Sequence, residues 1–505
     1  MKKFLVVLIA LAVVSGGAGV LLSIGPVNKM AKKYVGDEMK KALPCKYKLG
    51  NISAGMMRGV ELQDLRLYDT SGDEFLYIHS LRLTFGLGSI IHPKNPFTAI
   101  VIEQAKARVT RDSSGRVNII QIMDKMQKQK NSDATIPRIK LYAMQMEWSD
   151  YKLGKNPPRE KFNIISADIE TGDSGAINIR NIRVQKGQTV VNLRGKWNDT
   201  PGAPVDLRIR VKPLVIKDML ALRRSLSDTR ALPELHIGGE GVFDCRISGP
   251  RGKEQPQGEL TIENGTLGAQ KIRRLSINFS PGADGRIEIR DFDVRSENGG
   301  RLRAGGAVAP AEPWKFDIKA KADRFPIDAL IGLTVAQPQL SGALDADLAV
   351  KGDSNNLKTI SGEGDVAIRN GEIIGVGDAG DPPTPFRTMQ ASLKASNGVV
   401  QISKGRLDSE ELLLQLDGNI GLDRTLDLSG KCEVSKRRVR RGIFKKIVTS
   451  VLPDGGVGYR FPIRIRGTFD KPDVSVKSGK LATDTVSDPI RDAGNKVQKF
   501  MKKVF

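Results

Sequence analysis

The chain has 505 residues and carries 80 lysines and arginines against 57 aspartates and glutamates, a formal net charge of +23. This charge favours polyanionic partners, either nucleic acid or an anionic membrane surface, and does not choose between them. The three cysteines, Cys45, Cys245 and Cys432, lie too far apart for a disulfide framework or a zinc motif. The pattern around Cys245 and Cys432 predicts small apolar residues on buried strand faces, with a reactive or paired thiol as the alternative.

The first predicted element is an uncharged stretch of 21 residues, Phe4–Ile24, which is long enough for a helix to cross a bilayer core of ~30 Å. The alternative is a cleaved signal peptide, with the small residues 15–19 as its cleavage region. Because the apolar run resumes at Val20–Ile24, we expect an uncleaved anchor. Lysines flank both of its ends, so a translocated C-terminal body is inferred from the signal-like position of the stretch.

A helix is expected at Val27–Leu43, where Pro44 ends it, and another at Val117–Lys128, where apolar residues recur at helical spacing. Most other segments alternate between apolar and polar residues, which is typical of strands with one buried face. We count roughly two dozen such strands, beginning with those at 46–52, 60–68, 75–85 and 99–109. Two further short helices are expected at Leu214–Leu226 and Phe325–Leu333.

One stretch of the chain recurs three times, at Gly175–Val184, Gly285–Val294 and Gly398–Leu407, with starts 110 and 113 residues apart. Each copy opens on glycine and is followed twenty residues later by another glycine, at positions 195, 305 and 418. A repeat made only of strands and turns predicts a sheet that grows by adding units.

Two further segments recur with them. Gly239–Gly249 returns as Gly342–Gly352, and Gly258–Gly265 returns as Gly364–Gly371. The second pair contains Asn-Gly, which predicts hairpins with type I′ turns because both central residues of that turn need positive φ.

These patterns predict a mostly β fold: an elongated, curved antiparallel sheet of repeated hairpin units, with an N-terminal transmembrane helix and a few short helices. With ~4.8 Å between neighbouring strands, one continuous sheet would be on the order of 100 Å long. Its apolar face cannot stay in water over that length. The sheet must therefore pack on a second sheet, close into a barrel, or curl into a trough that holds an apolar guest.

Several segments resemble the AsmA-like envelope proteins, which are related to the TamB-like proteins of the bridge-like lipid-transfer superfamily. They are the anchor-helix-strand start, Ile102–Met123, Gly364–Gly371, Gly398–Gly418 and the Ile-x-Gly-Thr-x-x-x-Pro-x-Val signature within Ile463–Val476. The resemblance covers residues 1–110 and 230–478. It implies an inner-membrane anchor and a periplasmic β-groove lined with apolar side chains. Larger members are thought to carry phospholipids between membranes or to support outer-membrane assembly, and this chain would need a partner or self-association to span the envelope.

The sequence divides into six predicted segments. They are an anchor (1–26), an N-terminal AsmA-like or chorein-like part (27–135), a middle β repeat (136–230), a second β repeat (231–340), a C-terminal AsmA-like β repeat (341–478) and a basic amphipathic C-terminal helix (479–505).

Inward-facing apolar residues are expected to line the groove: Trp314, Phe316, Ile318, Leu412, Leu414, Leu416, Leu426, Leu428, Phe461, Ile463 and Ile465. Three basic segments are expected to contact membrane surfaces. The first two are amphipathic and act through Lys436, Arg437, Arg438, Arg440, Arg441, Lys445 and Lys446 and through Lys499, Phe500, Lys502 and Lys503. The third is the cluster Lys29–Lys48, which is expected to contact headgroups beside the anchor. A solvated helix that caps the sheet is the alternative for the first segment.

The sequence offers little support for catalysis. His79, His92 and His236 are scattered, and the chain contains no nucleophile elbow or Walker loop. Aromatic residues make up 5% of the chain, too few near the basic segments for a nucleic-acid surface. We therefore expect a membrane-anchored, non-enzymatic periplasmic protein that needs no cofactor and holds lipid acyl chains, with a partner protein at its far end. A scaffold whose core is filled by its own side chains is the alternative, and an envelope-anchored hydrolase is a third.

Overall fold

The computed structural model describes residues 45–55, 59–69, 72–85, 97–118, 138–154, 156–157, 159–171, 176–226, 235–309, 314–333, 339–373, 383–409, 412–434, 459–468 and 472–476. The predicted anchor, the helix at 27–43, nearly all of the helix at 117–128 and both basic amphipathic segments lie outside these ranges. Among the helices that are described, none has the length and hydropathy needed to cross a membrane.

The chain forms two compact units. Unit 1 consists of Met1–Leu232 and Gly241–Gly258, and unit 2 consists of Pro233–Glu240 and Glu259–Phe505. The boundary between them crosses strands β11 (Ile237–Pro250) and β12 (Gln255–Leu267). The finer division into six segments and the elongation of the whole chain stay predictions.

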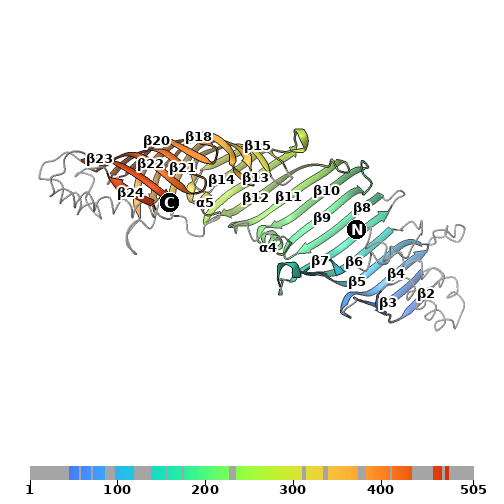
Figure 1. Ribbon diagram of the computed structural model, residues 1–505. Coiled ribbons are helices and arrows are strands. Elements are labelled where there is room, and N and C mark those ends of the chain that lie inside the picture. Colours follow the sequence, from blue (N-terminus) through green and yellow to red (C-terminus); the bar gives the residue numbers. More distant parts are fainter. Residues whose placement is uncertain are drawn as a thin grey trace. The chain divides into compact units, whose positions relative to one another are not determined.

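Unit 1 contains ten complete strands and one α-helix within the described ranges (Figure 1). They are β1 (Lys46–Lys48), β2 (Ile52–Gly55), β3 (Gly59–Tyr68), β4 (Glu74–Phe85), β5 (Phe97–Arg111), β6 (Arg138–Asp150), β7 (Arg159–Thr171), β8 (Ala176–Lys186), β9 (Thr189–Asn198), β10 (Pro204–Val215) and α4 (Ile216–Leu226), with a 3₁₀ turn η2 (Tyr151–Leu153). From β3 to β10 each strand pairs with the next, and β1 and β2 both pair with β3.

Unit 2 is built from strands and one short helix in its described part. They are β13 (Gln270–Pro281), β14 (Ile287–Ser296), β15 (Arg301–Val308), β16 (Lys315–Pro326), α5 (Ile327–Ile331), β17 (Leu340–Asp353), β18 (Asn356–Ile373), β19 (Thr384–Ser396), β20 (Val399–Ser409), β21 (Leu412–Gly421), β22 (Thr425–Val434), β23 (Tyr459–Thr468) and β24 (Pro472–Val476), with a 3₁₀ turn η4 (Ala283–Gly285). From β13 to β24 every strand pairs antiparallel with the next.

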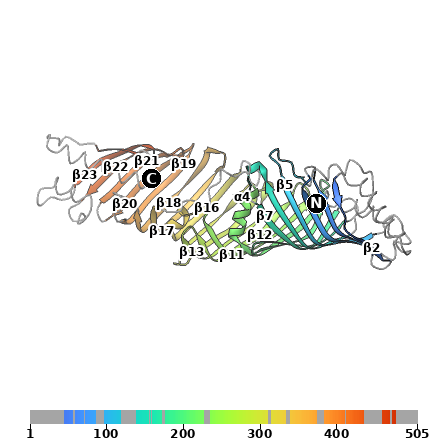
Figure 2. The same cartoon turned by 90° about the horizontal axis from the view of Figure 1, so that it is seen from below.

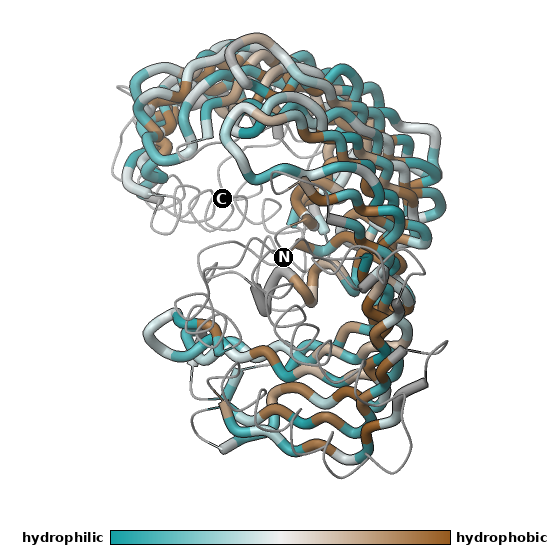
Figure 3. Tube along the Cα trace, turned by 90° about the vertical axis from the view of Figure 1, so that its right-hand side faces the viewer, coloured by the Kyte–Doolittle hydropathy of each residue, from teal (hydrophilic) through white to brown (hydrophobic). Residues whose placement is uncertain are grey.

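The prediction of a mostly β, antiparallel, curved sheet is therefore confirmed within each unit, and apolar and polar residues alternate along the strands (Figure 3). One pair departs from it. Strands β5 and β6 are parallel, with Ala99 opposite Arg138 and Arg111 opposite Asp150. Parallel neighbours cannot be joined by a tight turn and need a crossover connection. The sequence between them carries the segment predicted as a helix.

The internal repeat corresponds to one bulged strand pair that occurs three times: β8–β9, β14–β15 and β20–β21. In each pair an isoleucine faces a glycine, and just beyond it two residues of the first strand oppose one residue of the second. The three facing pairs are Ile179–Gly195, Ile289–Gly306 and Ile402–Gly418. In the middle copy the glycine that faces the isoleucine is Gly306, the neighbour of the repeat's Gly305.

The prediction of hairpin turns at the two repeated Asn-Gly pairs is wrong. Asn264 and Asn370 do have positive φ, 52° and 50°, but β12 and β18 continue through them. Asn370 and Gly371 together oppose the single residue Gly342, so the pair forms a bulge. A different Asn-Gly pair, Asn397–Gly398, makes the two-residue turn between β19 and β20, with φ of 52° and 79°.

The two predicted short helices are confirmed as α4 and α5, and each is held to a turn between strands by an aspartate near its start. Asp218 of α4 accepts hydrogen bonds from the Gln188 and Thr189 amides at 3.0 and 3.1 Å. Asp328 of α5 accepts one from the Gln270 side chain. Helix α4 also contacts β6 and β7, four and three strands before β10, beside the curved sheet (Figure 2).

A dense apolar core lies in unit 1 across strands β2 to β7. Leu62, Leu81 and Ile100, from three neighbouring strands, are completely buried. The segment before β3 packs against this core through Cys45, Tyr47 and Leu49. In this part of unit 1, the inward side of the sheet is filled by the chain's own side chains.

Candidate functional site

Unit 2 carries a continuous apolar face across strands β16 to β22. In an antiparallel sheet, residues that oppose each other in register point to the same side. The registers join Ala320, Leu348, Gly364, Leu393, Ile402, Gly418 and Leu428 in one row across seven strands. A second row joins Ile318, Val350, Gly362, Ala395, Val400, Ile420 and Leu426. We call all the residues on this side of strands β16 to β23 the apolar face. It includes Leu416 and, across Gly430, Ile463 of β23.

The apolar face is only partly buried over its middle strands. Leu348, Leu393 and Ile402 all stay partly exposed, although they lie at the centre of the sheet. Toward the other strand ends, Leu344 and Ile368 oppose each other and are buried. The face therefore has a buried margin and a middle that is partly exposed.

Small residues shape this middle. Gly364 stands between Leu348 and Leu393, and a Cβ there would lie 2.1 Å from the Asp347 carbonyl oxygen. Only glycine allows the neighbouring strand to come this close. The Leu348 side chain leans over Gly364, because its Cδ2 would lie 2.7 Å from a Cβ at that position.

Most of the predicted groove-lining residues lie on the apolar face. Leu414, Leu426, Leu428, Ile463 and Ile465 are buried at its β21–β23 end. Leu416, Phe316 and Ile318 are partly buried, and Trp314 is 53% exposed just before β16. The side chains of Leu412 and Phe461 lie outside the described ones. Contact of any of these residues with lipid stays a prediction.

The opposite face of unit 2 is polar and carries ion pairs across neighbouring strands. Asp427 of β22 lies 3.2 Å from Arg464 and 3.4 Å from Arg466, both on β23. The hydrogen bond from Arg464 is the main cause that lowers the pKa of Asp427. These pairs are solvent-exposed, so they add little stability but keep the outer face soluble.

The cysteines behave as the sequence predicts for Cys245 and Cys432, which are both buried. Burial raises the pKa of the Cys432 thiol to about 12 and that of Cys45 to about 11. Thiols with such values stay protonated at neutral pH and are poor nucleophiles.

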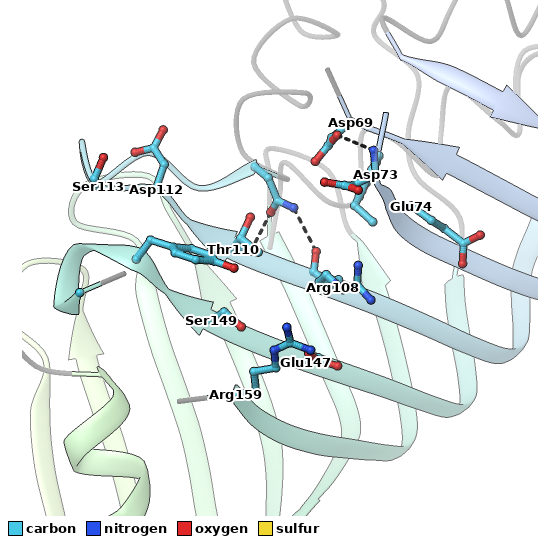
Figure 4. Close-up of a pocket in the computed structure, with 14 residues that line it drawn as sticks. Asp69, Asp73, Glu74, Arg108, Thr110, Asp112, Ser113, Glu147, Ser149 and Arg159 are labelled. Atoms are coloured by element: carbon cyan, nitrogen blue, oxygen red, sulfur yellow. Dashed lines mark hydrogen bonds and ion pairs between the residues drawn. The ribbon is translucent and has the colours of Figure 1, made fainter. Parts of the chain in front are cut away.

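A second candidate is a polar pocket of about 800 Å³ in unit 1 (Figure 4). It lies between the β3–β4 turn and the ends of β5 to β7. Five carboxylate side chains and two arginines line it: Asp69, Asp73, Glu74, Asp112, Glu147, Arg108 and Arg159. Sequence reasoning missed this pocket, because its residues come from turns and strand ends far apart in the chain.

Internal hydrogen bonds shape the pocket wall. The Asn118 side chain donates to the Arg108 carbonyl oxygen at 3.0 Å and accepts from the Thr110 amide at 3.1 Å. Glu147 lies 3.7 Å from Arg159. The described lining residues include neither histidine nor cysteine, so they offer no nucleophile paired with an imidazole base. Across the described ranges, no group of three or more His, Cys, Asp or Glu side chains could hold a metal ion.

These features define a class of protein: curved, mostly antiparallel sheets with one polar, ion-paired face and one apolar face that is buried across β2 to β7 of unit 1 and partly exposed over the middle strands of unit 2. Among known proteins, the chain is similar to the AsmA family protein YhjG of Escherichia coli (strain K12), with 25% identity over 375 residues. The match covers 65% of this chain and 50% of YhjG, so the chain spans about half the length of that relative. No family model matches the chain. The similarity to YhjG confirms the AsmA-like resemblance seen in the sequence.

Proposed function

We propose that this chain is an envelope protein that holds the acyl chains of phospholipids along the apolar face of unit 2. In this role it would serve lipid transport between membranes or outer-membrane biogenesis. The observation that carries the proposal is the partial exposure of Leu348, Leu393 and Ile402 at the centre of that face. Exposed apolar area of this kind is costly in water and marks a binding surface. The AsmA family relative supports an envelope role.

The proposed mechanism is passive. Acyl chains slide along the apolar face, while headgroups stay at the wet edge of the sheet. No covalent step or cofactor is involved. An N-terminal anchor in the inner membrane, with the sheet in the periplasm, would keep the protein at the membrane that supplies the lipid.

Two neighbouring residues of β21 provide a matched test. Leu416 belongs to the apolar face and is partly buried, whereas Gln415 is exposed on the polar face. A photo-crosslinking residue placed at Leu416 in the full chain should label phospholipid in cells, and the same residue at Gln415 should give only background. Equal labelling at the two positions would remove the groove assignment.

The alternative function is an envelope scaffold with a self-filled interior and no lipid cargo. The buried core of unit 1 favours it, because the chain fills its own apolar face there. Lipid extraction and native mass spectrometry of the purified chain separate the two functions. Stoichiometric phospholipid supports the carrier, and its absence together with unlabelled Leu416 supports the scaffold.

A further inference from the structure

One edge of unit 2 brings together four turns that are far apart in sequence. Antiparallel strands send every second turn to the same edge of a sheet. The turns are those between β15 and β16, β17 and β18, β19 and β20, and β21 and β22. Trp314 and Ser354 exchange hydrogen bonds at 3.0 and 3.1 Å, and the Leu422 amide donates to the Gly398 carbonyl oxygen at 2.8 Å. We call this edge the Trp314 rim.

Large apolar side chains project into solvent along the Trp314 rim. Trp314 is 53% exposed, Leu357 is 51% exposed and Val399 is 39% exposed. Only three other large apolar or aromatic side chains in the described part of the chain are comparably exposed. A row of such residues on successive turns is unusual for a surface that meets only water.

Lysines accompany these apolar residues. Lys315, Lys351, Lys358 and Lys394 lie within four residues of the turns and are exposed. Aspartates lie in and beside the same turns and keep their charge: Asp353 accepts from the Asn355 amide at 2.9 Å, Asp423 accepts from the Thr425 hydroxyl at 2.7 Å, and Asp317 and Asp427 lie two residues further along their strands. Together with Arg424, the lysines exceed these carboxylates by one charge, so the rim presents apolar side chains among lysines with a small positive excess.

We propose that the Trp314 rim docks on the interface of an anionic lipid membrane. Tryptophan prefers the headgroup level, where its ring meets the acyl region and its N–H meets water. Apolar side chains surrounded by lysines are typical of protein segments that insert shallowly into anionic bilayers. With one aromatic residue among the turns, the rim lacks the stacking residues that a nucleic-acid surface uses. The docking goes beyond the proposed cargo function, because it concerns the edge of the sheet and not its apolar face.

Val399 offers a reporter that is separate from the apolar face. Its register partners are Ser396 and Gly421, whereas the adjacent Val400 points to the apolar side with Ala395. In the full chain with Trp148 and Trp197 changed to phenylalanine, the native Trp314 reports membrane contact at the rim itself, and Val399→Trp reports it in the same chain with Trp314 also changed. Gln415→Trp, exposed in the middle of the polar face, is the matched control. Leu357→Trp is a second rim reporter in case Val399→Trp fails to fold.

The probe is a vesicle of brominated phosphatidylcholine in which about a third of the lipid is phosphatidylglycerol, a charge that a polybasic surface detects. The rim reporters should be quenched on these vesicles, less on vesicles without phosphatidylglycerol, and less again in high salt, while Gln415→Trp stays bright. Circular dichroism checks that each variant is folded. Folded rim reporters that stay as bright as Gln415→Trp would overturn the proposal.

Charge reversal gives a second arm. The double variant Lys315→Glu/Lys358→Glu should lose most of the quenching at Val399→Trp. The control Lys319→Glu/Lys431→Glu makes the same change in net charge at exposed mid-sheet positions and should keep the quenching. Equal loss in both would mean that total charge and not the rim directs binding, and would overturn the proposal. Crosslinking at Leu416 tests the cargo function independently of either result.

Discussion

The two units treat the same kind of apolar strand face in opposite ways. In unit 1, Leu62, Leu81 and Ile100 lie on one face of three neighbouring strands and have no exposed area. In unit 2, the equivalent central positions of the sheet stay partly exposed, and glycines such as Gly362 and Gly364 alternate with larger residues. Side-chain size differs between them: leucine and isoleucine dominate the unit 1 core, whereas glycines and alanines alternate with larger residues on the apolar face of unit 2. One architecture thus provides a buried core in one unit and a partly exposed apolar face in the other.

The largest expected effect comes from truncating the two faces. Leu81→Ala should cost unit 1 about 2–5 kcal/mol of unfolding free energy, because it removes a fully buried side chain from a packed core. Leu348→Ala should cost unit 2 less, about 1–2 kcal/mol, because part of its side chain already meets solvent. Urea unfolding can follow the units separately in two single-tryptophan backgrounds, one that keeps Trp148 for unit 1 and one that keeps Trp314 for unit 2.

Each of these two variants serves as the control of the other. Leu81→Ala should leave the Trp314 transition in place, and Leu348→Ala should leave the Trp148 transition in place. A loss of stability in unit 2 as large as that in unit 1 would show that the apolar face is packed after all, and the contrast between the units would fail.

A smaller effect is expected at the repeated bulge. Gly418 has φ of 142°, and a Cβ there would lie 2.3 Å from the Asp427 carbonyl oxygen. Gly285 has φ of 72° with open space around it. Gly285→Ala should therefore cost about 1–2 kcal/mol from backbone strain, whereas Gly418→Ala should cost roughly 1–3 kcal/mol more, because the neighbouring strand must also move.

Both glycine variants are measured by urea unfolding with Trp314 as the reporter. Gly195→Ala extends the test to unit 1, because Gly195 has φ of 130° and a Cβ at this position would lie 2.0 Å from the Asp206 carbonyl oxygen. If the repeat is equivalent in both units, Gly195→Ala and Gly418→Ala should have similar costs. A cost at Gly418 no larger than at Gly285 would contradict the role of close strand approach.

Much of this fold follows from local pattern. The two short helices, most strand positions and the common face of Leu414, Leu428 and Ile465 could be predicted from alternation and spacing. Alternation fails where the backbone leaves the strand region: Leu62 and Leu65 are both buried although they are an odd number of residues apart, with Asp64 between them at φ of 55°. Such a residue changes which side chains face inward without leaving a clear sign in composition.

Other features depend on partners far along the chain. The parallel pairing of β5 with β6 requires knowing where a crossover returns, and the polar pocket gathers Asp69, Asp112 and Arg159 from separate elements. The degree of burial on the apolar face is also non-local. Ile465 is fully buried and Leu416 is partly exposed although both alternate equally well in sequence, because burial depends on the residues that stand opposite and above.

The smallest expected effect concerns acid. In unit 1, Asp168 accepts a hydrogen bond from the Arg138 Nε at 2.7 Å, and this bond is the main cause that lowers the pKa of Asp168. Arg464 lowers the pKa of Asp427 in unit 2 in the same way. A carboxylate with a lowered pKa in the folded state contributes stability above its unfolded pKa of about 3.9, and that contribution is lost as pH falls through the folded value.

Asp168→Asn should therefore flatten the fall in unit 1 stability below about pH 4 and leave unit 2 unchanged, and Asp427→Asn should do the reverse. The changes should be small because solvent screens both pairs. The measurement is the urea midpoint of each tryptophan transition against pH. If either substitution altered the acid response of both transitions equally, the two units would not unfold separately. The buried face of unit 1 and the partly exposed face of unit 2 could then be compared only through the stability of the chain as a whole.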